Sequence, residues 1–148
     1  MPTPLELFSE QIGKKLDKTF SPAGNWLLGT LLDVSKSHIK VQYEVRKEMC
    51  NPAKILHGGV ASLMLDEVIG MANFVAGSTY LMTSINLNVD FLSPAPIGEK
   101  LEVSAKLVRL GSNLNHWEAV ITKSSGKIVA KASSNMIKTH TKLSELGF

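Results

Sequence analysis

The spacing of apolar residues divides the chain into helical and extended segments. Between Leu5 and Leu16 apolar residues recur every three or four positions, which predicts an amphipathic helix over about residues 3–18. Between His38 and Val45 apolar and polar residues alternate, which predicts a strand with one buried and one solvent-facing side. An earlier extended run ends near Ser35, and residues 22–25 carry the signals of a turn.

A second helical pattern occupies the middle of the chain. Residues 56–75 are apolar on nearly all sides, which predicts a long helix that other elements must cover. Strand-like runs follow over residues 80–92, 100–110, 114–124 and 127–139, with turn signals between them. The tail, residues 140–148, is predicted to be either disordered or a short cap.

The order of these elements predicts the architecture. Consecutive strands joined by short turns favour an antiparallel sheet. A curved sheet folded around the apolar helix is the simplest way to bury that helix on most sides. Since 148 residues is a single-domain length, we expect one α+β domain that spans residues 1–148.

Composition narrows the function classes. A net charge of +3 without a basic block interleaved with aromatics argues against nucleic acid as a partner. Cys50 is the only cysteine, which excludes an intrachain disulfide and fits a reducing compartment. The N-terminus lacks a secretory pattern. We expect no apolar stretch long enough to span a bilayer, because polar residues and glycines interrupt the longest one. The histidines lack metal-ligand spacing. We therefore expect a cytoplasmic protein with no metal and no membrane partner.

A polar stripe runs along the predicted central helix. On a helical wheel its members fall within one sector of roughly 80°. They are Gly59, Ser62, Asp66, Gly70 and Asn73. The stripe allows two interpretations: a helix–helix contact in which Asp66 is a structural hydrogen-bonding group, or a site where a ligand approaches the carboxylate. Glu67 points about 100° away, and we expect it to reach the sheet rim or to pair with a lysine.

The start of this helix has the chemistry of an anion site. His57, Gly58 and Gly59 lie where the first amides of a helix have no intrahelical partner. Glycine leaves those amides unshielded, and the helix dipole adds partial positive charge. Such a site suits a carbonyl oxygen that gains negative charge during acyl transfer.

Together, these residues resemble those of a known family. Asn51, the "LHGG" that contains His57, and Asp66 nine residues after His57 are similar to the motif of the hotdog-fold acyl-CoA thioesterases of the phenylacetate-degradation (PaaI) type. The likeness covers about residues 27–138 and includes the Ser-Pro-x-x-x-Gly turn at residues 93–98. The resemblance implies a hotdog fold, in which a curved antiparallel sheet wraps one long helix.

The resemblance also implies catalytic roles by position. Asp66 matches the catalytic carboxylate, and the Gly58 amide matches the group that polarises the thioester carbonyl. His57 and Asn51 match residues that shape this site. Ser84 matches a strand hydroxyl that holds the hydrolytic water, although a strand serine bonded to a neighbour fits its position equally well.

Substrate-binding candidates are less specific. Gly59 would let the substrate approach the helix start, and Met82 is a candidate for the acyl pocket or for the core. Arg109 is a candidate for the coenzyme A phosphates, or a solvated surface charge. No separate cofactor is expected, because coenzyme A is part of the substrate.

The spacing of Gly58 and Asp66 predicts an assembly. Eight residues of helix separate them by about 12 Å, too far for both to act on one thioester from one chain. We therefore expect a homodimer with two sites at its interface, and the resemblance implies that dimers pair into tetramers.

The predicted function is hydrolysis of an acyl-CoA thioester with an aryl or short to medium acyl group. Asp66 would act as general base or as nucleophile, and the sequence does not choose between them. The alternative is a non-catalytic hotdog module that binds acyl thioesters. A hotdog hydratase is disfavoured, because its Asp/His or His/Glu pattern is absent.

Overall fold

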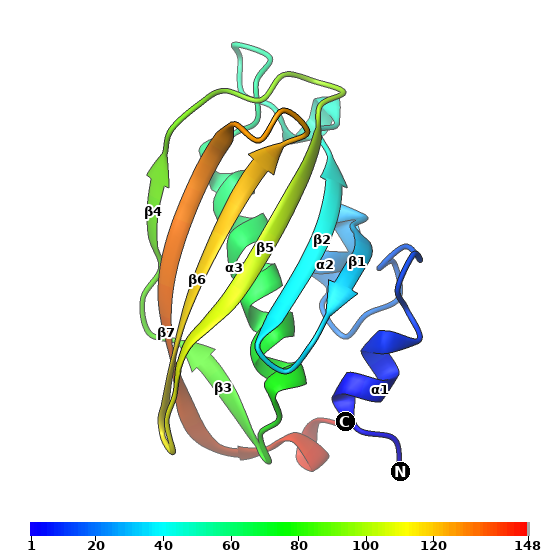
Figure 1. Ribbon diagram of the computed structural model, residues 1–148, viewed down its shortest axis with the longest axis vertical. Coiled ribbons are helices and arrows are strands. Elements are labelled where there is room, and N and C mark those ends of the chain that lie inside the picture. The colour runs from blue at the N-terminus through cyan, green and yellow to red at the C-terminus, as the bar shows by residue number, and fades with distance from the viewer. Residues whose placement is uncertain (148) are drawn as a thin grey trace.

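A single curved antiparallel sheet wraps the central helix (Figure 1). The computed structural model describes residues 1–147. Within them the seven strands are β1 (Thr30–Val34), β2 (His38–Glu44), β3 (Tyr80–Ser84), β4 (Asn88–Phe91), β5 (Lys100–Leu110), β6 (Leu114–Lys123) and β7 (Ile128–Lys142). The strand order is β1-β2-β5-β6-β7-β3, and β4 also pairs with β7. The helices are α1 (Pro4–Ser9), α2 (Pro22–Leu27) and α3 (Gly58–Ala76), with 3-10 turns η1 (Lys47–Met49) and η2 (Leu143–Leu146).

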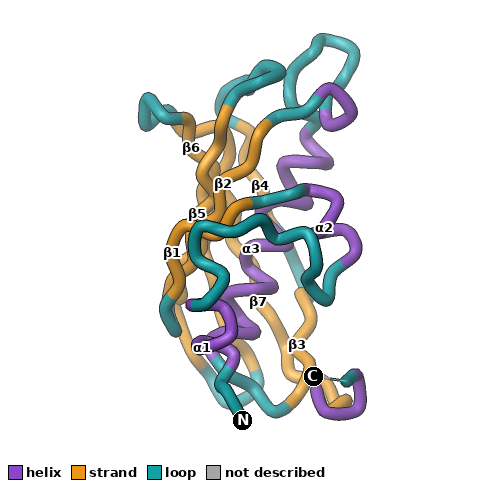
Figure 2. The backbone as a smooth tube through the Cα atoms, turned by 90° about the vertical axis from the view of Figure 1, so that its right-hand side faces the viewer, coloured by secondary structure: helices purple, strands orange, loops and turns teal. Residues whose placement is uncertain are grey.

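Helix α3 lies in the concave face of the sheet, and α1 and α2 flank its other side (Figure 2). Its sheet-facing residues, including Met64, Leu65 and Val68, are fully buried. The alternating residues of β2 meet them, because Ile39, Val41 and Tyr43 are buried while their neighbours are not. The predicted hotdog architecture is confirmed.

Among the helices of residues 1–147, α3 alone is long and apolar enough, by length and composition, to cross a membrane. Half of its apolar window is buried inside the protein, however, and the sheet covers it. The expectation that no stretch is long enough to span a bilayer is therefore wrong on length. The burial of α3 accounts for its apolar composition as a core helix.

The predicted helix over residues 3–18 is too long. Helix α1 begins at a capping box, in which Thr3 and Glu6 bond to each other's backbone amides, and it ends at Ser9. Gly13 then adopts a φ of 83°, and the Leu16 amide donates to the Gly29 carbonyl at 2.7 Å. These bonds beside β1 satisfy backbone groups of this segment in place of helical hydrogen bonds. Helical spacing alone therefore overestimated α1.

Residues 22–25 form part of a helix, and the predicted turn is wrong. Ser21 caps α2 by accepting a hydrogen bond from the Gly24 amide at 3.1 Å, and Pro22 occupies the first helical position. Proline suits that position because the first amide of a helix lacks a partner in any case.

The predicted strand over residues 80–92 is interrupted. Asn86 lies between β3 and β4, where its carbonyl accepts from the Ser134 hydroxyl at 2.8 Å and its side chain accepts from the Asn135 amide at 2.8 Å. These bonds to β7 replace regular ladder pairing at the break. In the tail, β7 continues to Lys142 with a register shift against β3, and η2 follows, which corresponds to the predicted short cap. Phe148 lies outside the described residues.

Candidate active site

His57 starts α3 with a side-chain cap. Its Nδ1 accepts a hydrogen bond from the Gly59 amide at 2.9 Å, and its backbone carbonyl accepts from the Val60 and Ala61 amides. The Gly58 amide donates no hydrogen bond to any residue between 1 and 147. Because the other first-turn amides are satisfied, Gly58 presents the unpaired donor at the positive end of a 19-residue helix.

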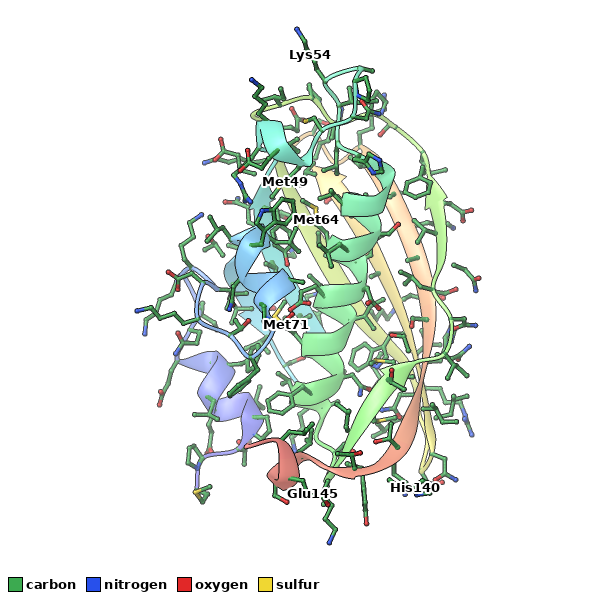
Figure 3. The ribbon with its side chains drawn as sticks, turned by 180° about the vertical axis from the view of Figure 1, so that it is seen from behind. Met49, Lys54, Met64, Met71, His140 and Glu145 are labelled. Atoms are coloured by element: carbon green, nitrogen blue, oxygen red, sulfur yellow. The ribbon has the colours of Figure 1, made fainter. Side chains whose placement is uncertain are left out.

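Asn51 supports the helix start from the preceding loop. Its Oδ1 accepts hydrogen bonds from the Ala53 amide at 3.0 Å and from the Ile55 amide at 3.4 Å. Lys54, at the tip of this loop in Figure 3, has a φ of 62°. Asn51 thus fixes a tight turn shortly before His57.

Asp66 and Ser84 meet, although 18 residues separate them in sequence. The Ser84 hydroxyl of β3 donates to Asp66 Oδ1 at 3.0 Å. Both side chains are half-buried, so the carboxylate is shielded on one side and accessible on the other. The contact brings together the two side chains to which the resemblance assigns the carboxylate and the strand hydroxyl, and it is also the neighbour bond that a structural strand serine would make.

Glu67 has a different partner from the one predicted. The Ser21 hydroxyl donates to Glu67 Oε2 at 2.9 Å, so Glu67 neither reaches the sheet rim nor pairs with a lysine. A Cβ at Gly24 would collide with this carboxylate, which explains the glycine in α2. Burial raises the pKa of Glu67, the Ser21 hydrogen bond lowers it, and the charge of Asp66 raises it further. Glu67 therefore joins α2 to α3.

The polar stripe of α3 does not act as one unit. Asn73 is buried and accepts from Asn115 Nδ2 at 2.7 Å and from Trp117 Nε1 at 3.0 Å, so its role is structural. Ser62 donates to the Gly58 carbonyl within the helix. A Cβ at Gly70 would meet nothing within 4 Å. Asp66 is the stripe's accessible charged group.

The proposed substrate-binding residues lie at different places. Gly59 is exposed at the start of α3, whereas Met82 lies beside Asn115, whose amide approaches the Met82 sulfur at 3.3 Å. Arg109 is exposed. It lies near the C-terminal end of α3, because the next residue, Leu110, pairs with Asn115, which bonds to Asn73 of α3. Residue 73, which Asn115 contacts, is roughly 22 Å along the helix from Gly58. One chain therefore does not bring Arg109 to the Gly58 amide.

Two contacts at the site were not predicted from the sequence. The Phe91 ring lies against Gly58, where a Cβ would stand 3.3 Å from the ring carbons. Ser21 contacts Glu67 across 46 residues. The Ser-Pro pair at residues 21–22 signals a helix cap, but no local pattern identifies the carboxylate that it meets.

Comparison with known proteins supports one family. A sequence model described as the thioesterase superfamily matches residues 53–130. Human acyl-coenzyme A thioesterase 13 is 26% identical over 103 residues, which are 69% of this chain and 74% of that protein. The 1,4-dihydroxy-2-naphthoyl-CoA thioesterase 2 of Arabidopsis thaliana is 28% identical over 98 residues, 66% of this chain and 62% of that protein.

Solved structures show the same fold. The Escherichia coli PaaI protein of the phenylacetic acid degradation operon aligns with a TM-score of 0.77 at 19% identity, covering 83% of this chain and 88% of that chain. A Streptococcus mutans protein solved with acetyl CoA aligns with a TM-score of 0.74 at 20% identity, covering 84% and 94%. The family match spans more than half of the chain and includes the start of α3, Asp66 and Ser84. The chain therefore belongs to the thioesterase superfamily, and it is an enzyme of the thioesterase class.

Proposed function

We propose that this protein hydrolyses acyl-CoA thioesters, with Asp66 as the carboxylate that activates water or attacks the carbonyl. The contact between Ser84 Oγ and Asp66 Oδ1 carries the proposal, because it joins a hydroxyl and a half-buried carboxylate from two elements. The unpaired Gly58 amide would stabilise the oxyanion. The names of the thioesterase relatives support coenzyme A as the leaving group. The proposed reaction needs no separate cofactor, because coenzyme A is part of the substrate.

Each site in this proposal is built from two chains. Helix α3 is continuous from Gly58 past Asp66, so the two groups are about 12 Å apart along its axis and do not meet on one substrate. The β3–β4 edge pairs only with β7 among the described strands and exposes Ile85, Phe91 and Leu92. A second copy placed against this edge would cover those apolar side chains and present its own α3.

Asp66→Asn tests the carboxylate directly. The amide keeps the shape of the side chain and still accepts the Ser84 hydrogen bond, but it does not act as base or nucleophile. Release of free coenzyme A thiol would be followed for phenylacetyl, hydroxybenzoyl, hexanoyl and palmitoyl thioesters. We expect turnover of at least one thioester and a loss on the order of 10²-fold or more in the variant. A fully active variant would overturn the assignment of Asp66.

A complementation experiment tests the shared site. Gly58→Pro removes the amide hydrogen at a helical position that tolerates proline, and the His57 ψ of 135° suits a residue before proline. Gly58→Pro and Asp66→Asn would each be inactive alone. When the two variants are co-expressed equally, about half of the dimers are mixed, and one of the two sites in each mixed dimer keeps both groups. About a quarter of wild-type activity should therefore return. No recovery in a dimer of confirmed mixed composition would place both groups on one chain.

The non-catalytic binding module gives a different result. Such a protein would bind acyl-CoA and coenzyme A without releasing thiol from any member of the panel. Inert wild type with measurable binding would replace the hydrolase proposal for this chain.

A further inference from the structure

A largely apolar cavity lies beside the C-terminal half of α3, outside the Asp66–Ser84 contact. Its volume is about 280 Å³. Gly70, Asn73 and Phe74 of α3 line one side of it, and Met82 of β3 lines another. The polar atoms of Asn73 already bond to Asn115 and Trp117, so this wall offers mainly apolar contact.

The cavity lies next to the Asp66–Ser84 pair on both elements that carry the pair. Gly70 follows Asp66 by one helical turn and therefore lies on the same side of α3. Met82 precedes Ser84 by two residues, so both side chains project from the same face of β3. A glycine at position 70 leaves open space, since a Cβ there would contact nothing within 4 Å. An acyl group attached to a carbonyl at Asp66 would enter the cavity past Gly70.

The outer wall comes from the N-terminal segment. Phe8 and Phe20 both pack on Phe74, with ring centroids 6.1 and 6.4 Å apart, and all three line the cavity. The Ser21–Glu67 hydrogen bond holds this segment against α3. Met71 lies between α3 and the same segment (Figure 3).

This wall is a feature of the chain outside the family match, which covers residues 53–130. Phe8, Phe20 and Ser21 precede the match, and Met136 and Leu143 follow it. The matched residues thus supply the proposed reacting groups and one half of the cavity, while the flanking residues form its outer wall, where Phe20 is partly exposed to solvent.

We propose that this cavity holds the acyl group of the thioester and that Phe20 limits its length, so that the preferred substrates carry a compact apolar acyl group. At about 30 Å³ for a water-sized group, the volume accommodates roughly nine non-hydrogen atoms. Hexanoyl, octanoyl and phenylacetyl groups fit, and a palmitoyl group does not. This inference rests on the proposed function and specifies its substrate class.

The test is an acyl-length profile of kcat/KM from acetyl- to palmitoyl-CoA. We expect wild type to favour acyl groups of about six to eight carbons. Phe20→Ala should raise the dodecanoyl to hexanoyl ratio of kcat/KM at least about tenfold, which is the gain from roughly two further buried methylenes at about fourfold each. Ile12→Ala is the matched control, because Ile12 is exposed in the same segment and does not line the cavity. Its ratio should stay within about twofold of wild type.

Gly70→Leu provides an independent arm by filling the cavity. Octanoyl-CoA turnover should fall at least about tenfold relative to acetyl-CoA, with the assembly state unchanged. Unaltered length profiles in both folded variants would overturn the inference while leaving thioester hydrolysis intact. Dissociation of the dimer by Gly70→Leu would assign Gly70 to an interface and also count against it. Wild type that hydrolyses no thioester would overturn the proposed function itself.

Discussion

Helix α3 carries two carboxylate–serine hydrogen bonds on adjacent residues. Ser84 donates to Asp66 at 3.0 Å, and Ser21 donates to Glu67 at 2.9 Å. The two bonds are chemically alike but join α3 to different elements: the Asp66 bond reaches strand β3, whereas the Glu67 bond reaches the N-terminal segment. The first lies within the family match on both sides, and the second does not.

The surroundings separate the two carboxylates. Glu67 presses against Gly24 and faces the buried Tyr43, whose pKa is raised by burial and by the charge of Glu67. Asp66 lies one turn from an open glycine and keeps an accessible side. A rotation of about 100° about the helix axis therefore places one carboxylate at the proposed reaction site and the other in a contact with α2.

The largest expected effect is on turnover. Asp66→Ala should lower kcat on the order of 10²-fold or more, whereas Glu67→Ala should lower hexanoyl-CoA kcat less than about fivefold. The reason is that Asp66 is the proposed reacting group, whereas Glu67 lines the acyl cavity and bonds to Ser21. Steady-state thiol release by the two purified variants measures both values. A greater loss in Glu67→Ala would reverse the assignment.

The second effect is on stability. Ser21→Ala should lower the free energy of unfolding by about 2 kcal/mol, because it removes both the α2 cap and a hydrogen bond to a partly buried carboxylate. Urea unfolding of Ser21→Ala and Ser84→Ala gives the comparison. Since Ser84 caps no helix, the free energy of unfolding should fall less in Ser84→Ala than in Ser21→Ala. Equal decreases would show that the two hydrogen bonds contribute equally to stability.

A smaller effect concerns Ser84 in catalysis. Ser84→Ala should lower kcat roughly tenfold by removing the hydroxyl that orients the Asp66 carboxylate. Ser62→Ala is the matched control, because its hydroxyl bonds to the Gly58 carbonyl within the helix. Similar decreases of kcat in Ser84→Ala and Ser62→Ala would contradict a specific role for the hydrogen bond between Ser84 and Asp66.

The smallest effect is a pH dependence of stability. Burial raises the pKa of folded Glu67 above its ordinary value of 4.5, so the folded state binds a proton that the unfolded state releases. The stabilisation from this group is complete below that value and is lost as the pH rises through the folded pKa. Wild type should therefore lose stability relative to Glu67→Gln as the pH rises from below 4.5 through the raised folded pKa of Glu67.

Urea unfolding of the pair across that pH range measures this difference. Asp66→Asn should weaken the dependence, because the charge of Asp66 also raises the pKa of Glu67. A stability difference that does not change with pH would contradict the assigned cause.

Periodicity predicted the elements that depend on local pattern. The β2 alternation and the apolar helix over residues 56–75 agree with β2 and α3, and β5 coincides with the predicted run of residues 100–110. The errors arose where tertiary pairing competes with local preference. Gly29 and Leu31 accept from residues 16 and 13, which ends the α1 pattern early, and Asn86 divides the run of residues 80–92 by bonding to β7.

The sequence by itself determined where the proposed reacting groups lie on α3, because the His57-Gly58-Gly59 start and the position of Asp66 depend on spacing within one helix. Only the tertiary structure decided their surroundings. Ser84 and Ser21 lie 18 and 46 residues from the carboxylates that they contact, and Phe20 reaches Phe74 across the chain. Local spacing fixes which face of a helix a side chain occupies, but the element that covers that face is set by packing between distant segments.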